Sequence, residues 1–316
     1  RLLNDHGEQF IENYGGEDGD AYTVGRDLAA YAILKECEAG RGSPNGGVWL
    51  SFQHLSRAEL DEAFGPIIKK LSINDIDLTR QAIEVAPIAH YHMGGIEVNG
   101  AMETCVRGLF AAGECVGGAN GANRLSGNAI PEAFVFGEIA GVNAANSTCE
   151  TPRLSIQIGQ NALSNSLVEL SRHAKQKSQF QTVTSRKLLF ELQKLMWKNV
   201  GVLRNKQGLK MAIDEIRRMK NDIFPNLKPA PGTVFNTSLM DWLDLRNSLL
   251  CAEAICLAAN ERRESRGAHQ MEDIPFKSDK FSKNQIISMI NGSLVSRWQD
   301  VQKLRVGLEE KRWGKV

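Results

Sequence analysis

The chain has 316 residues, and its 38 Lys and Arg against 37 Asp and Glu leave a net charge of +1. Apolar residues make up 42% and charged residues 24%, which excludes intrinsic disorder, collagen and a disulfide-stapled mini-protein. This length predicts two or three domains with sizeable cores. No apolar run reaches the roughly 18 residues that a transmembrane helix needs, and the first residues lack a signal-peptide pattern. Because the sequence begins with Arg1 and not Met, we expect it to start partway through a longer protein.

Cysteine and charge usage narrow the function classes. Six cysteines are scattered without a CxxC pair, which argues against a zinc site or an iron–sulfur cluster within the chain and favours reduced thiols in the cytosol.

Positive charge is concentrated in one segment. Residues 172–220 contain 13 Lys or Arg and 3 Asp or Glu, a net charge of +10 that leaves −9 for the rest of the chain. A solvated helix face is the plain interpretation, and a docking surface for an acidic partner is the alternative. Nucleic acid is disfavoured because no aromatic–basic pattern accompanies the charge.

The first 82 residues mix helical and extended signals. An imperfect apolar stripe predicts a helix over 26–39 that stops at Gly40. The run 48–52 is typical of a strand. Residues 55–71 predict a second helix with a break near Gly65 and Pro66.

Residues 84–144 contain short extended segments and a loop rich in glycine and asparagine. They predict a strand over 96–100 ending in an Asn-Gly turn, and a short buried strand over 108–114 that ends on Glu114. A loop rich in Gly and Asn leads into a helix over about 128–146. Helix N-termini offer free N–H groups to an electron-rich ligand, and glycines allow close approach of the backbone. From these residues alone, a cofactor site and a plain strand–loop–helix connection are equally supported.

The remainder is mostly helical. Apolar stripes predict helices over 188–203 and 209–219, and a third runs from about 236 to 263. Three amphipathic helices joined by short breaks predict an antiparallel bundle. The last fifty residues give no clear pattern.

Four motifs follow one another along the chain. They are His90-Tyr91-His92-Met93-Gly94-Gly95, Gly-Leu-Phe-Ala-Ala-Gly-Glu-Cys over 108–115, Gly-Ala-Asn-Arg-Leu-Ser-Gly-Asn-Ala-Ile over 121–130, and Glu264-Ser265-Arg266-Gly267-Ala268-His269 with Asp273-Ile274-Pro275. Together they closely resemble the succinate dehydrogenase/fumarate reductase flavoprotein family. Asn4, Gly7, Phe10 and Gly25-Arg26-Asp27 resemble the family's capping domain.

The resemblance implies an α+β chain in four parts. Residues 1–83 would be the C-terminal part of a capping domain, and 84–147 the C-terminal part of an FAD-binding α/β domain. Residues 148–275 would form a helical, three-helix-bundle domain, and 276–316 a tail. The family's GxGxxG half-site for FAD is absent. We therefore expect an incomplete FAD site and no activity from this chain alone.

The resemblance also implies roles for three residues at the substrate. Arg26 would donate a proton to one alkene carbon of fumarate while flavin N5 passes a hydride to the other. Without the resemblance, a helix-start Arg paired with Asp27 or Glu36 is the plainer interpretation, because an arginine side chain normally keeps its proton and is a poor acid. His90 and Arg124 would bind the substrate carboxylates, for which the planar guanidinium is well shaped. His92 lies outside the matching pattern and is taken as structural.

At the cofactor, the resemblance implies that Glu114 contacts FAD. Backbone N–H groups at Asn128, Ala129 and Ile130 would face the flavin pyrimidine edge. One departure bears on substrate preference: the family usually carries His at the position of Asn120. Ala129 also stands where many members have Ser, but backbone atoms act there. Ser265, Arg266 and His269 would order the helical domain against the flavin domain, and we expect Arg266 in an ion pair.

The implied function is that of a flavoprotein subunit that interconverts fumarate and succinate and exchanges electrons with an iron–sulfur partner. It would be cytoplasmic, peripheral on the membrane through partner subunits and without a span of its own. An L-aspartate oxidase, which works without such a partner, is the alternative. Its motif usually reads H-Y-x-C-G-G, so Met93 favours the reductase branch. A third alternative is a folding or docking module without catalysis.

Overall fold

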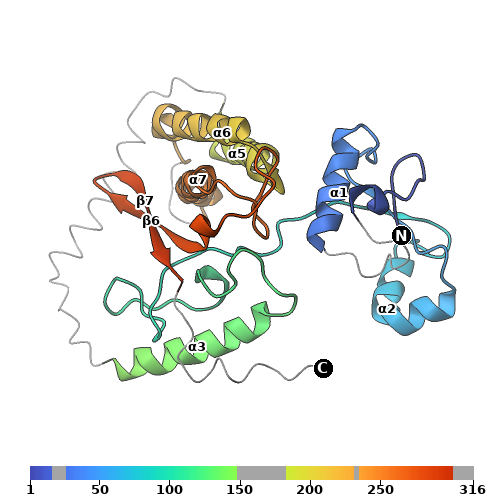
Figure 1. Cartoon of the computed structure of the whole chain (residues 1–316), viewed down its shortest axis with the longest axis horizontal. Coiled ribbons are helices and arrows are strands. Elements are labelled where there is room, and N and C mark those ends of the chain that lie inside the picture. The colour runs from blue at the N-terminus through green and yellow to red at the C-terminus, as the bar shows by residue number, and fades with distance from the viewer. Residues whose placement is uncertain (16–25, 148–182, 231–234, 302–316) are drawn as a thin grey trace. The chain divides into compact units, whose positions relative to one another are not determined.

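A computed structural model describes residues 1–15, 26–147, 183–230 and 235–301. The chain divides into two compact units, Arg1–His90 and Tyr91–Val316, and each is described by itself. Helix and sheet are mixed, and the C-terminal region is helical, which confirms the α+β class (Figure 1). The limits of the four predicted domains stay a prediction. In the described part of the chain, no helix is long and apolar enough to cross a bilayer.

The first unit is built on a small antiparallel sheet. Strands β1 (Leu2–Leu3), β2 (Val48–Leu50) and β3 (Ile83–Val85) pair in the order β1-β2-β3. Its core gathers apolar side chains from η1 (Ile11–Tyr14), α1 (Arg26–Glu38) and β2, around four buried residues: Phe10, Ala32, Ile33 and Val48. The predicted strand at 48–52 is confirmed over its first three residues.

Glycine, proline and a capping box set the limits and the kink of the two helices in this unit. Helix α1 (Arg26–Glu38) is followed by Gly40, whose φ of 73° suits glycine and breaks the helix. Helix α2 (Arg57–Ser72) begins at a capping box between Ser56 and Glu59. It kinks at Phe64, because Pro66 can neither continue the hydrogen-bond ladder nor fit the preceding turn. Both predicted helices and the predicted break are confirmed.

A buried carboxylate ties α1 to its surroundings. Glu36 is 1% exposed and accepts hydrogen bonds from Arg41 Nε (2.9 Å) and Nη2 (2.7 Å), from Tyr14 Oη (2.7 Å) and from Asn4 Nδ2 (3.1 Å). The Arg41 hydrogen bonds, more than any other contact, lower the pKa of Glu36 to about 2. The cation that Glu36 holds is therefore Arg41.

The loops at the start of the second unit correct two expectations. Residues 96–100 form single bridges, Ile96 with Val116 and Val98 with Thr104, and no extended strand. The predicted buried strand over 108–114 is wrong, because this segment has one bridge, Phe110 with Glu103, and Leu109 is 53% exposed. Glu114 therefore does not end a strand. It lies in a 3-10 turn, η2 (Gly113–Cys115).

Helix α3 (Ala129–Asn146) is confirmed where the sequence predicts it. Among the described elements it packs chiefly on η2. The helix is apolar, but several of its large side chains are exposed: Ile130, Phe134, Val135 and Val142.

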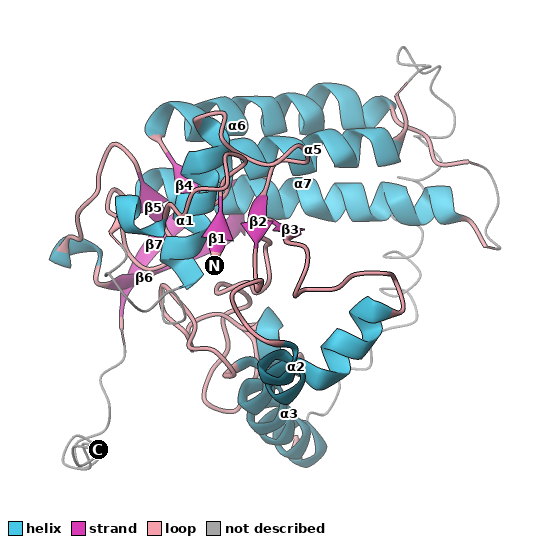
Figure 2. Cartoon of the chain, turned by 90° about the vertical axis from the view of Figure 1, so that its right-hand side faces the viewer, coloured by secondary structure: helices cyan, strands magenta, loops and turns pink. Residues whose placement is uncertain are grey.

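Three helices form the predicted bundle, α5 (Ser185–Val200), α6 (Lys206–Arg218) and α7 (Thr237–Glu261). They pack on one another pairwise and lie side by side in both views (Figures 1 and 2). Side-chain oxygens of Thr184, Asn205 and Asn236 cap their N-termini. Helix α6 continues through a π turn, η3 (Met219–Ile223), and a 3-10 turn, η4 (Phe224–Asn226), where Phe224 stacks on buried Trp242 with ring centroids 4.8 Å apart.

The chain after α7 contains two pairs of strands. Strand β5 (Gln270–Met271) runs parallel to β4 (Leu203–Arg204), which follows α5. After η5 (Asp279–Phe281), β6 (Lys283–Ile290) and β7 (Ser293–Asp300) form an antiparallel hairpin beside α7. Its two-residue turn is Asn291-Gly292, with φ of 50° and 78°. This Asn-Gly pair was a hairpin signal in a region for which we predicted no structure.

A second buried carboxylate organises the segment after α7. Glu264 is fully buried and accepts hydrogen bonds from Arg262 Nη1 (2.8 Å), Arg266 Nε (2.9 Å) and Nη2 (3.0 Å), and Ser278 N–H (3.0 Å). Burial by itself would raise the pKa of Glu264, but these hydrogen bonds outweigh it and lower the pKa to about 2. The ion pair expected of Arg266 is confirmed.

Replacing Glu264 should destabilise the protein strongly, because Glu264→Gln leaves two arginines without their buried partner. We expect a loss of about 3–5 kcal/mol in the free energy of unfolding at pH 7, measured in urea. The folded pKa is lowered, so the contribution is complete above the unfolded value of 4.5 and is lost as pH falls toward about 2. The gap between wild type and variant should therefore narrow at pH 3. Glu215→Gln, which breaks a partly exposed pair with Arg218, is the control and should cost at most about 1 kcal/mol. Equal losses in the two variants would contradict this expectation.

Candidate functional site

Two loops that carry predicted site residues touch through glycine backbone. Ile96 N–H donates to Cys115 O at 2.7 Å, and Gly117 N–H donates to Ile96 O at 3.1 Å. A Cβ atom on Gly95 would lie 2.3 Å from Cys115 O, so only glycine allows this approach. The Met-Gly-Gly and Gly-Glu-Cys motifs are therefore held at a fixed distance from each other.

The backbone contact between these two loops places Glu114 beside His92. The Glu114 carboxylate is exposed, and its Oε1 accepts a hydrogen bond from His92 N–H at 3.0 Å. Its Oε2 has no hydrogen-bond partner within the described ranges. His92 thus acts here through its backbone, as expected of a structural residue, and one oxygen of Glu114 stays open to a ligand.

Arg124 is held in place but not neutralised. Its guanidinium lies over the Tyr91 ring, 4.3 Å from the centroid, and Nη1 donates to Leu125 O at 3.1 Å. Its Nε is buried and has no hydrogen-bond partner in the described part of the chain. A buried, unpaired donor on a permanent cation is costly unless an acceptor occupies the site. Nη2 also has no hydrogen-bond partner among the described residues and is not buried, so it is the donor of this guanidinium that a ligand carboxylate can reach.

A polar triad that we did not predict supports the Tyr91 ring. Tyr91 Oη donates to Glu132 Oε2, and Asn120 Nδ2 donates to Glu132 Oε1 at 2.6 Å and to Tyr91 Oη at 3.4 Å. The hydrogen bond to Glu132 is the main reason why the pKa of Tyr91 is raised. Asn120, which stands where the family pattern has His, therefore anchors the ring under Arg124. Glu132, the only acid in the first turn of an apolar helix, was the sequence signal that we missed.

The start of α3 offers one free backbone donor. Asn128 precedes the helix without a side-chain cap, and Pro131 has no N–H. Ile130 N–H donates to Gly127 O at 3.3 Å, whereas Ala129 N–H has no acceptor among the described residues. Together with the open oxygen of Glu114, this donor suits the edge of a flavin, which carries both donors and acceptors. The residues present therefore fit part of an FAD site.

The Glu-Ser-Arg-Gly-Ala-His motif touches the loop that carries Arg124. Its tip is a tight turn, with Arg266 N–H donating to His269 O at 2.8 Å and Gly267 at a φ of 57°. Ala268 N–H donates to Ala122 O at 2.8 Å, and a Cβ atom on Gly267 would lie 2.4 Å from the same oxygen. The motif thus seats the Gly-Ala-Asn-Arg loop through backbone contact.

His269 fixes the base of this turn. Its Nδ1 lies 2.7 Å from Arg204 Nη1 and its Nε2 lies 2.9 Å from Arg262 O. Burial, and next the charge of Arg204, lower the pKa of His269 to about 4. The ring is neutral at pH 7, so Nδ1 accepts from Arg204 and the Nε2 proton is donated to Arg262 O. This is a structural role.

Two predicted residues lie in the first unit. Arg26 is the first residue of α1, and its side chain lies outside the described atoms. His90 is exposed in the segment after β3. The structure brings together Glu114 and the loops of Tyr91 and Arg124 in the second unit, and the roles of all the predicted site residues stay predictions.

Family models match both parts of the chain. The FAD binding domain matches residues 1–130, and the fumarate reductase flavoprotein C-terminal domain matches 190–311. A polypeptide of the fumarate reductase (CoM/CoB) of Methanothermobacter marburgensis is 33% identical over 87% of this chain and 48% of its own length. The 8-methylmenaquinol:fumarate reductase flavoprotein subunit of Wolinella succinogenes is 33% identical over 99% of this chain and 52% of its own.

Solved structures agree. A variant of FrdA from E. coli quinol fumarate reductase has a TM-score of 0.83 at 28% identity, covering 96% of this chain and 55% of that chain. The chain thus spans about half the length of the curated relatives it matches. The matched domain and the flavoprotein relatives identify FAD as the cofactor. The chain belongs to the fumarate reductase/succinate dehydrogenase flavoprotein family.

Proposed function

We propose that this chain is part of a flavoprotein that interconverts fumarate and succinate. The observation that carries the proposal is Arg124, a cation held over Tyr91 with a buried Nε that lacks a partner in the described residues. A dicarboxylate would accept from the open Nη2 of the same guanidinium, whose plane suits a carboxylate. Relatives that are fumarate reductase subunits support the same substrate class.

The chain's own residues would divide the work on the substrate. Arg124 would bind one carboxylate and His90 the other, so the alkene lies fixed between them. Arg26 would hold a proton at the substrate and deliver it to one alkene carbon, or remove it in the reverse direction. Before the transfer, the positive charge of its guanidinium would also stabilise the negative charge that develops there.

The cofactor would be held partly by this chain. Glu114 Oε2 and Ala129 N–H are the open groups that would contact FAD. FAD, when bound, would accept or donate the two electrons of the reaction. The positive end of α3 would favour extra negative charge on the cofactor.

We further propose an iron–sulfur partner and a peripheral position on the cytoplasmic membrane through partner subunits. The six cysteines are scattered without a CxxC pair, which disfavours a cluster bound by these 316 residues and is consistent with a cluster held elsewhere. Several relatives are subunits of larger enzymes by name, which supports the same assembly.

Arg124→Ala in the flavin-loaded, full-length protein should weaken binding of malonate, a dicarboxylate that needs no turnover. Losing a charge-assisted hydrogen bond should lower the affinity about ten- to hundredfold, measured by titration of the flavin absorbance. Arg107→Ala, which removes an exposed arginine from the same unit, is the matched control. His90→Ala is expected to behave like Arg124→Ala. Unchanged malonate affinity with flavin retained would remove either residue from the substrate site.

Arg26→Lys in the full-length enzyme should lower turnover by orders of magnitude while flavin content stays the same. Lysine keeps the charge but not the planar fork, so the variant separates geometry from charge. Arg57→Lys, at the exposed start of α2, is the control. Near-normal fumarate reduction by Arg26→Lys would exclude it as the proton donor.

Gly267→Ala should disturb the site from a distance, because its Cβ would collide with Ala122 O and push the loop of Arg124. We expect weaker malonate binding and lower flavin content with the helix content intact, measured by circular dichroism. Gly292→Ala is the matched control, since Gly292 also has a positive φ but nothing within 4 Å of its Cβ position. Its backbone strain should cost about 1–2 kcal/mol of stability and leave malonate affinity unchanged. If both variants lowered malonate affinity equally, backbone strain alone would explain the effect, and the contact between residue 267 and Ala122 O would not be needed.

A further inference from the structure

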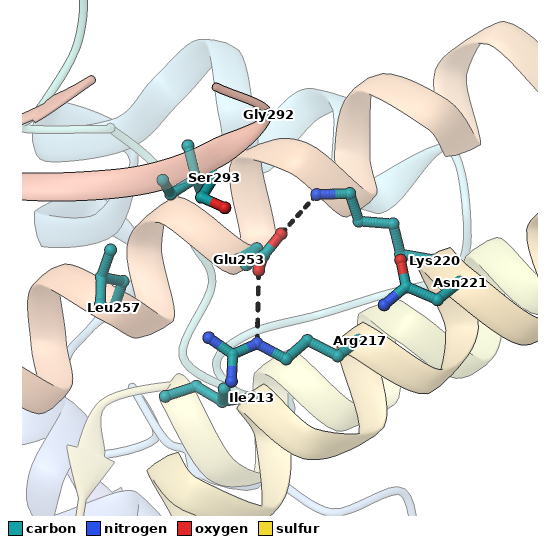
Figure 3. Close-up of a pocket in the computed structure, with 9 residues that line it drawn as sticks. Ile213, Arg217, Lys220, Asn221, Glu253, Leu257, Gly292 and Ser293 are labelled. Carbon is teal, nitrogen blue, oxygen red and sulfur yellow. Dashed lines mark hydrogen bonds and ion pairs between the residues drawn. The ribbon is translucent and has the colours of Figure 1, made fainter. Parts of the chain in front are cut away.

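A cationic pocket lies on the helical bundle, away from the residues assigned above. Its volume is about 280 Å³, and it is bounded by α6 with its π turn, by α7 and by the β6–β7 turn. Figure 3 shows Arg217 and Lys220 reaching the same carboxylate, Glu253, with Ser293 across the opening. All of these residues belong to the second unit.

Charge in this pocket does not balance. Glu253 is mostly buried and receives Arg217 Nε at 3.4 Å on one oxygen and Lys220 Nζ at 2.7 Å on the other. Two cations share one anion, so the cluster carries a net charge of +1. The longer contact to Arg217 leaves this guanidinium weakly held.

Several hydrogen-bond donors in the pocket are unused. In the described part of the chain, the two terminal nitrogens of Arg217 contact no acceptor, and Lys220 has one partner. The Asn221 amide and the Ser293 hydroxyl line the same space without a hydrogen bond to any described residue. A negatively charged group would meet four donors from three elements.

The backbone explains why these donors converge. Residues 217 and 221 are four apart, so they lie on one helix face, and the π turn over Met219–Ile223 widens the helix there. The two-residue turn at Gly292 closes the opposite side. Ile213, Leu257 and Leu294 give the pocket an apolar wall.

We propose that this pocket binds a small organic anion, with a carboxylate or phosphate group on Arg217, Lys220 and Asn221 and a short hydrocarbon part against the apolar wall. The volume lies at the lower limit for ligand pockets, which suits a few-carbon anion and not a nucleotide. The arginine fork matches both oxyanions. None of the lining residues belongs to the proposed FAD or dicarboxylate site.

The proposal can be tested by calorimetry on the 316-residue chain. The chain is titrated with propionate, and separately with inorganic phosphate, at constant ionic strength. We expect saturable binding of at least one anion, and the stronger of the two identifies the preferred group. Arg217→Gln and Lys220→Gln should each weaken binding about ten- to hundredfold. Arg218→Gln, which removes a neighbouring arginine paired with Glu215, is the matched control and should bind as wild type.

Glu253→Gln separates a ligand site from a structural ion-pair cluster. Removing the carboxylate raises the net charge of the cluster and frees both cations, so anion affinity should rise. A purely structural cluster would lose stability without any gain in affinity. Absence of saturable binding by both anions, or equal binding by Arg217→Gln and wild type, would overturn the proposal. The Arg217 and Lys220 variants decide the matter if Glu253→Gln does not fold.

Discussion

The buried Glu264 carboxylate is the interaction on which the site of the second unit depends. It holds Arg262 and Arg266 and accepts from the backbone of Ser278, so the chain after α7 must fold back on itself. That fold creates the tight turn whose tip, Gly267 and Ala268, seats the loop of Arg124. A buried charge therefore helps to set the position of the loop that carries Arg124.

The site contrasts fully paired groups with open ones. Tyr91, Asn120 and Glu132 satisfy one another and form a rigid base. On that base, Arg124 Nε and one oxygen of Glu114 have no partner in the described residues. Rigid support reduces the entropy lost on binding, while open polar groups supply the attraction. The same logic applies to the cationic pocket, where Glu253 positions two cations without using all their donors.

Much of the fold could be predicted because the signals are local. Apolar periodicity predicted α1, α2 and the bundle helices, Gly40 marked the end of α1, and Pro66 marked the kink in α2. The strand expected over 108–114 failed because a strand needs a continuous neighbour, and this segment has a single bridge. Periodicity also could not tell that α3 would leave Phe134 and Val135 exposed, since it reports an apolar face but not its partner.

By itself the sequence determined the family and the cofactor, because motifs such as Gly-Ala-Asn-Arg are contiguous and keep their spacing, and it predicted which side chains carry the chemistry. It also predicted that Arg266 is ion-paired, although not that Glu264 is the partner. Only the tertiary structure showed that Glu132 and Asn120 support Tyr91, and that Gly267 touches Ala122 across 145 positions of sequence. Such contacts depend on backbone approach and burial, which are properties of the packed chain and leave no periodic trace in the order of its residues.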